Sequence, residues 1–397
     1  MLRLYWALCL LSVSAHAASY RFSAVWDGSK LHKDACVNIQ ADRIQSVGAC
    51  SGTPIDLSRF TAIPGLIDVH THLTYVLENR VSQAGRGAAV VYLARENARK
   101  TLETGVTTVR DLGASDYADI AMRDLINSGQ MAGPRMFVAG YGLQITRGRQ
   151  GGPGTADGPA EVLRIVRQQI GAGADWVKMY GSTGSGRDVT GFETFTFEEM
   201  KAAVDAAHAL GKRIAIHSYG PAGARDAVRA GADSLEHATD MDDETIADMA
   251  RRKTFYVPTI DHNRYYADNS KLLNYPPGAV DDLKTYVQRN LETARKAFAA
   301  GVRFAMGSDA VYTMFGENTR ELGWFVKAGM TGEQALRTAT TGAAELMNMT
   351  GRVGSLQPGS YADVVAVEGD PLADIDVVIN KVRWVMKGGE VVVDRTK

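Results

Sequence analysis

The stretch that decides the fold is IPGLIDVHTH, Ile63 to His72, in which an apolar run ends in two histidines. Side chains two residues apart on a β-strand point to the same side, so His70 and His72 can bind one ion from one face. A histidine pair of this kind can equally be solvated in a loop. The rest of the chain has to separate these alternatives.

Outward from this stretch, short apolar runs alternate with longer amphipathic ones between residues 63 and 310, which is typical of repeated strand and helix units. Apolar residues at three- and four-residue intervals predict helices over 90–103, 161–170, 197–210 and 281–300. Eight strands are predicted: Ile63 to His70, Val106 to Leu112, Arg135 to Gly140, Trp176 to Tyr180, Arg213 to Ser218, Ser234 to His237, Phe255 to Ile260, and Arg303 to Asp309. Eight such units predict an α/β fold with a closed (β/α)8 TIM barrel.

The two ends of the chain have a different pattern. Tyr20 to Leu57 and Asp363 to Asp394 are rich in Val and Ile, with turn signals and no helical period. We therefore expect a small β-sandwich built from residues 18–62 and 359–397, framing a catalytic barrel of residues 63–358. The glycine-rich segment Tyr141 to Gly158 is either an active-site loop or a flexible surface loop.

Composition excludes some classes of function. Hydrophobic residues make up 45% of the 397 residues, charged residues make up 22%, and the net charge is -1. This balance is typical of neither a disordered chain nor a nucleic-acid-binding surface, so we expect a small-molecule substrate and no nucleic-acid partner.

The N-terminus predicts export. Residues 1–17 combine a basic start, an apolar stretch and the small-x-small site Ala15-His16-Ala17, as in a secretory signal peptide. An uncleaved anchor is the alternative, but the apolar stretch is shorter than the ~20 residues that span a bilayer. We expect a periplasmic or secreted protein with no membrane contact after cleavage.

Cleavage would remove Cys9 and leave Cys36 and Cys50. They flank an alternating segment that turns near residues 41–43, so a hairpin would bring them fairly close. A disulfide and two free thiols both remain open at this point. A catalytic role is disfavoured because neither cysteine has a histidine or basic neighbour that would lower its pKa.

Residues capable of binding metal stand at the ends of several predicted strands. In a barrel, chemistry gathers at the carboxyl ends of the strands. Each residue has an ordinary structural alternative, such as a core histidine, a lysine reaching the rim or an aspartate capping a turn. Together they favour a site: His70, His72, Lys178, His217, His237 and Asp309.

Five segments resemble the motifs of the amidohydrolase superfamily, in the family's order and across nearly the whole mature chain. They are PGLIDVHTH, DWVKMY, IHSY, LEH and GSDA. Within the superfamily the chain is similar to the metal-dependent dipeptidase branch, which includes Xaa-Pro dipeptidases, imidazolonepropionase-like proteins and hydrolases of ochratoxin-type amides.

The resemblance implies a site for two divalent metals. His70, His72 and Asp309 would hold one metal, and His217 and His237 the other. Lys178 would bridge them as a carbamate formed with CO2, because a free lysine is protonated at neutral pH and cannot be a ligand. Imidazole and carboxylate ligands suit zinc, which we expect, although manganese or iron would accept the same donors.

The resemblance also implies a mechanism. Two cations would share a water, lower its pKa and polarise the substrate carbonyl, so that a bridging hydroxide attacks the amide. Asp309 would pass the proton to the leaving nitrogen, and Lys178 is the second residue assigned to catalysis. No Gly-x-Ser-x-Gly motif supports a serine mechanism.

Candidate substrate contacts are fewer. Tyr219, two residues past His217, is either a donor to a substrate carboxylate, as in similar dipeptidases, or a packed aromatic. Arg147 and Arg149 stand where many relatives have Gly-Gly-His, and they either grip a carboxylate or reach solvent. His262 is a candidate contact whose position in the sequence favours the surface.

The leading hypothesis is an exported dipeptidase- or carboxypeptidase-like enzyme that cleaves a dipeptide or an N-acyl amino acid with a free carboxylate, possible substrates including ochratoxin A. The alternatives are a cyclic-amide hydrolase of the imidazolonepropionase type and a non-catalytic binding module. Because relatives are often oligomeric, we expect a homo-oligomer.

Overall fold

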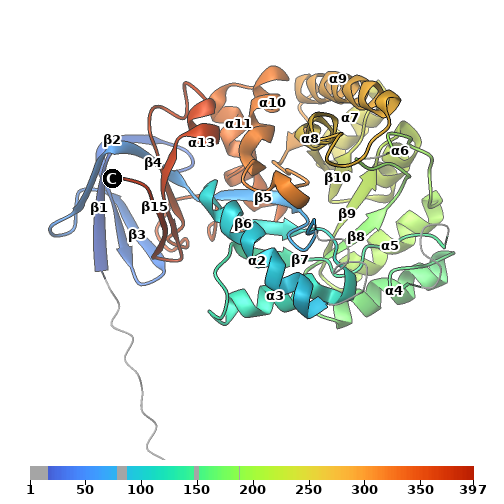
Figure 1. The fold of residues 1–397 in the computed structure, drawn as a ribbon, viewed down its shortest axis with the longest axis horizontal. Coiled ribbons are helices and arrows are strands. Elements are labelled where there is room, and N and C mark those ends of the chain that lie inside the picture. Colours follow the sequence, from blue (N-terminus) through green and yellow to red (C-terminus); the bar gives the residue numbers. More distant parts are fainter. Residues whose placement is uncertain (1–16, 78–86, 147–151, 187) are drawn as a thin grey trace, which may run out of the picture.

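The computed structural model describes residues 17–77, 87–146, 152–186 and 188–397 (Figure 1). The predicted signal peptide lies outside these residues, apart from Ala17, which begins the first strand. Arg147 and Arg149 lie outside them as well. In the described parts of the chain, no helix is both long enough and apolar enough to cross a membrane.

Strands from both chain ends lie together at one side of the molecule (Figure 1). They form one sheet of seven strands in the order β15-β14-β13-β4-β1-β2-β3. The strands are β1 (Ala17–Trp26), β2 (Leu31–Gln40), β3 (Arg43–Gly48), β4 (Ile55–Pro64), β13 (Val364–Val367), β14 (Val382–Lys387) and β15 (Glu390–Asp394). Strand β4 joins the N-terminal and C-terminal strands into one sheet, because it pairs in parallel with β1 and antiparallel with β13. The sheet has an apolar core of its own, in which Phe22, Val37 and Trp384 are buried.

Two details of this region go beyond the pattern in the sequence. Cys36 of β2 and Cys50 form a disulfide. The C-terminal part was expected to contain no helix, which is wrong, because α13 (Asp376–Asn380) lies between β13 and β14. The Asp374 side chain accepts a hydrogen bond from the backbone N–H of Asp376, which favours the start of this short helix.

Eight further strands are all parallel to their neighbours and form two sheets. The first has the order β5-β6-β7 and the second β12-β11-β10-β9-β8. They are β5 (Leu66–Thr71), β6 (Val106–Asp111), β7 (Arg135–Val138), β8 (Trp176–Tyr180), β9 (Arg213–Ser218), β10 (Ser234–His237), β11 (Phe255–Val257) and β12 (Arg303–Phe304). Backbone contacts link the two sheets at both margins. Leu143, after β7, pairs with Met179 of β8, and Asp309, after β12, donates its N–H to the carbonyl of His70 in β5 at 2.7 Å.

Five of the eight predicted strands have different bounds. The second ends one residue earlier than predicted, at Asp111, and the other four differ for local reasons. Ile63 and Pro64 belong to β4, and the chain changes partner at Gly65, where a Cβ would lie 2.2 Å from Thr107 Oγ1. The third strand ends before Gly140, whose φ is +66°. The seventh ends at Val257, because Pro258 has no N–H to donate and Thr259 is left-handed with a φ of 49°.

The eighth predicted strand, Arg303 to Asp309, is the most shortened. Strand β12 ends at Phe304, although Ala305 still donates its N–H to the carbonyl of Tyr256. Gly307 passes so close to β5 that a Cβ would lie 2.7 Å from the Cβ of His70, and Asp309 has a φ of 50°. With this irregular backbone, the Asp309 side chain lies against His70 of β5 and against His72, directly after β5.

Helices follow most of these strands and cover the outside of the sheets (Figure 1). Those between the strands are α2 (Gly87–Glu103), α3 (Ala118–Asn127), α4 (Pro159–Gly171), α5 (Phe197–Ala209), α6 (Pro221–Ala230), α7 (Asp243–Arg252), α8 (Ile260–Asp268) and α9 (Pro277–Ala299). Those after β12 are α10 (Glu321–Lys327), α11 (Gly332–Thr338) and α12 (Thr341–Leu346). The helix α8, directly after β11, takes the place of the end of the seventh predicted strand.

Candidate active site

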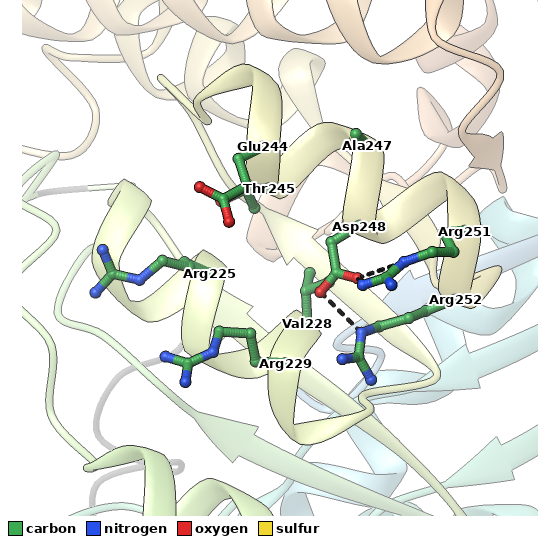
Figure 2. A pocket seen from close by; sticks show the side chains of 9 residues that line it. All are labelled: Arg225, Val228, Arg229, Glu244, Thr245, Ala247, Asp248, Arg251 and Arg252. Carbon is green, nitrogen blue, oxygen red and sulfur yellow. Dashed lines mark hydrogen bonds and ion pairs between the residues drawn. The ribbon is translucent and has the colours of Figure 1, made fainter.

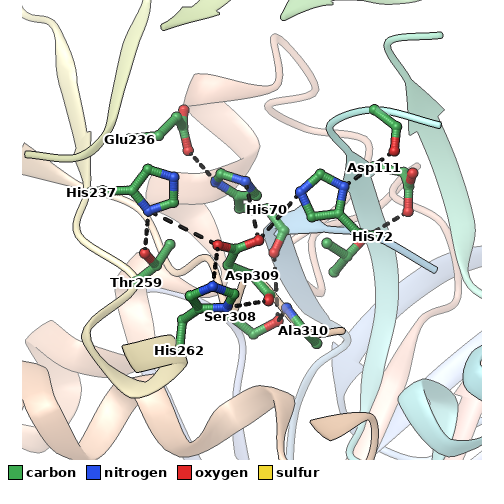
Figure 3. Close-up of polar contacts among 12 residues, drawn as sticks. His70, His72, Asp111, Glu236, His237, Thr259, His262, Ser308, Asp309 and Ala310 are labelled. Carbon is green, nitrogen blue, oxygen red and sulfur yellow. Dashed lines mark hydrogen bonds and ion pairs between the residues drawn. The ribbon is translucent and has the colours of Figure 1, made fainter. Parts of the chain in front are cut away.

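The structure brings predicted ligands from different strands to one buried place. The Asp309 carboxylate lies between the rings of His70, His72, His237 and His262 (Figure 3). Its oxygens are 3.5 Å from His70 Nε2, 3.3 Å from His72 Nε2 and 3.2 Å from His262 Nε2. Single ligand atoms of His70, His237 and Asp309 all lie within 4.8 Å of one another, as required of a metal site.

The tautomers of two histidines follow from their partners. His70 Nδ1 lies 2.7 Å from Glu236 Oε2 and His72 Nδ1 lies 3.1 Å from the carbonyl of Gly113, and a carboxylate or carbonyl oxygen can only accept. Both Nδ1 atoms therefore donate, and in the neutral rings both Nε2 lone pairs face Asp309. Acceptors that face one another at 3.3–3.5 Å repel unless a cation or a proton lies between them. These residues fit a metal ion for this reason.

Lys178 and His217 supply two more atoms without partners. Among the described residues, Lys178 Nζ and His217 Nε2 are buried and have no hydrogen-bond partner. The His217 ring lies 4.4 Å from the ring of His237, between centroids. A buried unpaired polar atom costs free energy, so these two atoms also suit a ligand that the protein alone does not provide.

Burial sets the charge of these groups. It lowers the pKa of the His217 and His237 imidazoles well below the ordinary value, and that of His70 to about 4 with help from the Lys178 charge. Neutral imidazoles are the form that binds metals. Burial also lowers the pKa of Lys178 to about 8, which increases the fraction of neutral amine able to react with CO2.

His262 is not where the sequence suggested. A surface position was favoured, and this is wrong: the side chain is buried at the first turn of α8. Its Nδ1 donates to the backbone carbonyl of Asp309 at 2.7 Å, and its Nε2 faces the Asp309 carboxylate. The left-handed Thr259 starts α8 early and turns His262 inward, which the strand expected there concealed.

Tyr219 lies beside the candidate site, and its ring is also packed between other aromatic rings. Its ring stacks on His217 on one side and on Tyr286 on the other. Its hydroxyl donates to Asn263 Oδ1 at 3.4 Å. The loop after β8 covers it so closely that a Cβ on Gly184 would lie 2.3 Å from the Tyr219 ring.

A hollow on the outer surface, of about 610 Å³, is a different feature. It lies between α6 and α7 and is lined by Arg225, Arg229, Asp248 and neighbouring residues (Figure 2). Asp248 accepts hydrogen bonds from Arg251 and Arg252, so two of the cations there are already paired. The hollow contains none of the predicted ligands.

Comparison with known proteins agrees with this geometry. The model of the amidohydrolase family matches residues 61–392. The chain belongs to the amidohydrolase family. It is 31% identical to the ochratoxinase of Aspergillus niger over 92% of this chain and 84% of that protein. A solved Xaa-Pro dipeptidase with bound methionine has a TM-score of 0.86 and 32% identity, covering 95% of this chain and 99% of that one. A prolidase complexed with N-methylphosphonate-L-proline has a TM-score of 0.87 and 28% identity, covering 96% and 100%.

Membership of the amidohydrolase family makes the protein a hydrolase that acts on carbon–nitrogen bonds, related to ochratoxinase and to prolidase-like dipeptidases. The family typically binds metals, and the cluster of histidines and Asp309 is placed accordingly. The fold is α/β with parallel sheets, as the sequence predicted.

In this amidohydrolase, two residues that support His70 were not among the site residues predicted from the sequence. Glu236 lies in the LEH motif and Arg110 in β6, and both side chains are completely buried. The Glu236 carboxylate accepts from His70 on one oxygen and from Arg110 Nη2, at 2.9 Å, on the other. Burial alone would raise the pKa of Glu236, but Arg110 and His70 outweigh it and lower the pKa to about 2. The available signal was a charged residue inside each of two predicted strands, because charged side chains are rarely buried in a strand without a partner.

We expect Glu236→Gln to weaken zinc binding 10- to 100-fold, since loss of the carboxylate behind a ligating histidine removes its orientation and part of its basicity. The free energy of unfolding should fall by about 3–5 kcal/mol, because Arg110 would keep a buried charge without its counter-ion. A chelator competition assay and urea unfolding measure the two effects. Glu198→Gln, an exposed residue in the first turn of α5, is the matched control. Unchanged zinc affinity in Glu236→Gln would contradict the positioning role.

Proposed function

We propose that this amidohydrolase is a metal-dependent enzyme that cleaves the amide bond of a dipeptide or an N-acyl amino acid with a free carboxylate. The observation that carries the proposal is the convergence of acceptor atoms on Asp309, where His70 Nε2 and His72 Nε2 lie within 3.5 Å of its carboxylate. Relatives named ochratoxinase, Xaa-Pro dipeptidase and prolidase support the substrate class.

In the proposed centre, His70, His72 and Asp309 would hold one divalent cation and His217 and His237 would hold the other. Lys178, as a carbamate, would be a ligand as well. Zinc is the cation proposed, because neutral imidazole and carboxylate donors suit it. When bound, the cations supply a water nucleophile at neutral pH and polarise the substrate carbonyl. The closed (β/α)8 barrel that would hold these residues is part of the proposal, supported by the backbone contacts at both margins of the two sheets.

The protein's own groups supply the proton transfer. The Asp309 carboxylate lies within 3.5 Å of the imidazoles of His70, His72 and His262, and a cation bound beside it would keep it ionised. As a carboxylate, Asp309 can accept the proton of the attacking water and deliver it to the departing nitrogen. His262 holds the backbone and the carboxylate of Asp309 in place from α8. Tyr219 and Tyr266 are buried against His217 and His262, which limits the access of water to the reacting groups.

The proposal also covers the location and the assembly of the protein. We propose that the chain is exported to the periplasm or beyond, meets its small-molecule substrate there and assembles as a homo-oligomer. The predicted signal peptide supports export, and the disulfide between Cys36 and Cys50 is compatible with an oxidising compartment.

A substrate panel with metal analysis tests the function. The protein, purified in zinc, is assayed on dipeptides with C-terminal Pro, Lys, Arg or Phe and on ochratoxin A. We expect turnover of at least one compound, about two equivalents of metal, loss of activity with a chelator and recovery with zinc. Metal-loaded protein that turns over none of them overturns the proposal. Ring opening of a lactam panel alone would favour a cyclic-amide hydrolase, and less than about one equivalent of metal would favour a non-catalytic module.

A further inference from the structure

The side chain of Asn263 is a buried polar group beside the candidate active site that the proposed chemistry leaves unused. It lies on α8, directly after His262, and is 1% exposed. Its Oδ1 accepts from the Tyr219 hydroxyl, but its Nδ2 has no hydrogen-bond partner among the described residues. A buried amide nitrogen with two unused N–H groups is costly to a folded protein, so it calls for an acceptor from outside the chain.

The surroundings place this amide at the edge of the candidate metal centre. The Tyr219 ring, whose hydroxyl binds Asn263, stacks on His217 with centroids 5.1 Å apart and lies 4.9 Å from the ring of His237. On the other side of Asn263, the preceding residue His262 contacts Asp309. Asn263 is thus tied to a ligand of each proposed metal through a single neighbour.

The loop after β8 covers the same corner. A Cβ on Gly184 or Gly186 would lie within 2.3 Å of the rings of Tyr219 and Tyr266, so the loop after β8 rests directly on these two tyrosines. Tyr275 donates to the Gly186 carbonyl and stacks on Tyr266, with centroids 5.8 Å apart. Under this cover, a hydrogen bond from protein to ligand competes little with water and therefore discriminates strongly between ligands.

We propose that Asn263 is a specificity-determining residue that donates through Nδ2 to the free carboxylate of the substrate, beside the hydroxyl of Tyr219. The inference rests on the proposed function, because a dipeptide or N-acyl amino acid carries this carboxylate. The bond from Tyr219 to Asn263 is long at 3.4 Å, so the phenol can exchange it for a carboxylate oxygen when substrate binds.

Two variants whose side chains have nearly the shape of asparagine separate the donor role of the Asn263 amide from its acceptor role. Asn263→Asp keeps the acceptor for Tyr219 but replaces the donor with a charge that repels a carboxylate. Asn263→Leu removes donor and acceptor alike. Tyr286→Phe is the matched control, because it deletes another buried hydroxyl that has no partner among the described residues, on the far face of Tyr219, and keeps the ring stack.

The measurement compares kcat/KM for two substrates, namely the panel compound that is turned over fastest and the same compound with its carboxylate replaced by hydrogen, which leaves no acceptor for Asn263 Nδ2. We expect Asn263→Asp to lower kcat/KM on the free acid at least 30-fold and Asn263→Leu about tenfold, mainly through KM. All variants should stay within about twofold of wild type on the compound without a carboxylate, which also shows that they fold and bind metal. Tyr286→Phe should match wild type on both.

Two results overturn the inference. One is a variant at position 263 that keeps wild-type kcat/KM on the free acid, and the other is an equal loss on both substrates, which would indicate a structural role or a contact with the scissile carbonyl. Failure of the proposed function looks different, because metal-loaded wild type would then turn over no compound of the panel.

Discussion

Replacing Asp309 with asparagine should lower kcat at least about 10³-fold, the loss expected when a positioned acid–base group is removed together with a charged ligand. The amide has nearly the same shape but cannot take the proton of the attacking water. Steady-state kinetics on the panel substrate measures the loss, with metal content determined on the same sample. Asp205→Asn, an exposed acid of α5 that is paired with Lys201, is the matched control and should leave kcat unchanged.

Stability should move in the opposite direction in the same variant. Without metal, wild type holds the Asp309 carboxylate against the Nε2 lone pairs of His70 and His72. The amide introduced by the substitution could donate to one of these nitrogens, so the chelated Asp309→Asn protein should melt no lower than chelated wild type. A kcat within tenfold of wild type would contradict the catalytic role. A much lower Tm without metal would contradict the account of the histidine tautomers.

The second large effect is expected at Lys178. Lys178→Ala should lose the second metal and most of its activity, because it deletes the side chain that would carry the bridging carbamate. Burial lowers the pKa of this lysine to about 8 and leaves its Nζ without a partner among the described residues, both of which favour capture of CO2. A short carboxylate such as acetate or propionate should fit the vacated space and restore part of the activity.

Metal analysis and kcat, each with and without added carboxylate, test this expectation. Lys201→Ala removes an exposed lysine on α5 and serves as the control for loss of a cation. Full activity of Lys178→Ala without added carboxylate would contradict the bridging role. Loss of activity with both metals still bound would instead assign Lys178 to the handling of substrate.

Much of the strand pattern was predictable, because it depends on local alternation of apolar residues. Strands β8, β9 and β10 have the predicted bounds, and each carries one predicted ligand: Lys178, His217 and His237. The strands on either side of them agree less well where single residues interrupt the backbone. Pro258 and the left-handed Thr259 end β11, and the close passage of Gly307 against β5 shortens β12.

The sequence by itself determined the set of chemical groups and their order: an apolar strand ending in His70 and His72, further candidates at later strand ends and, through the family motifs, the class of reaction. Only the tertiary structure decided how these groups meet. It turned His262 inward onto Asp309, placed Glu236 and Arg110 behind His70, and left the Asn263 amide nitrogen beside Tyr219 without a partner in the described part of the chain. The physical reason is that these contacts join residues from 44 to 166 positions apart, whereas strand and helix patterns report only on near neighbours.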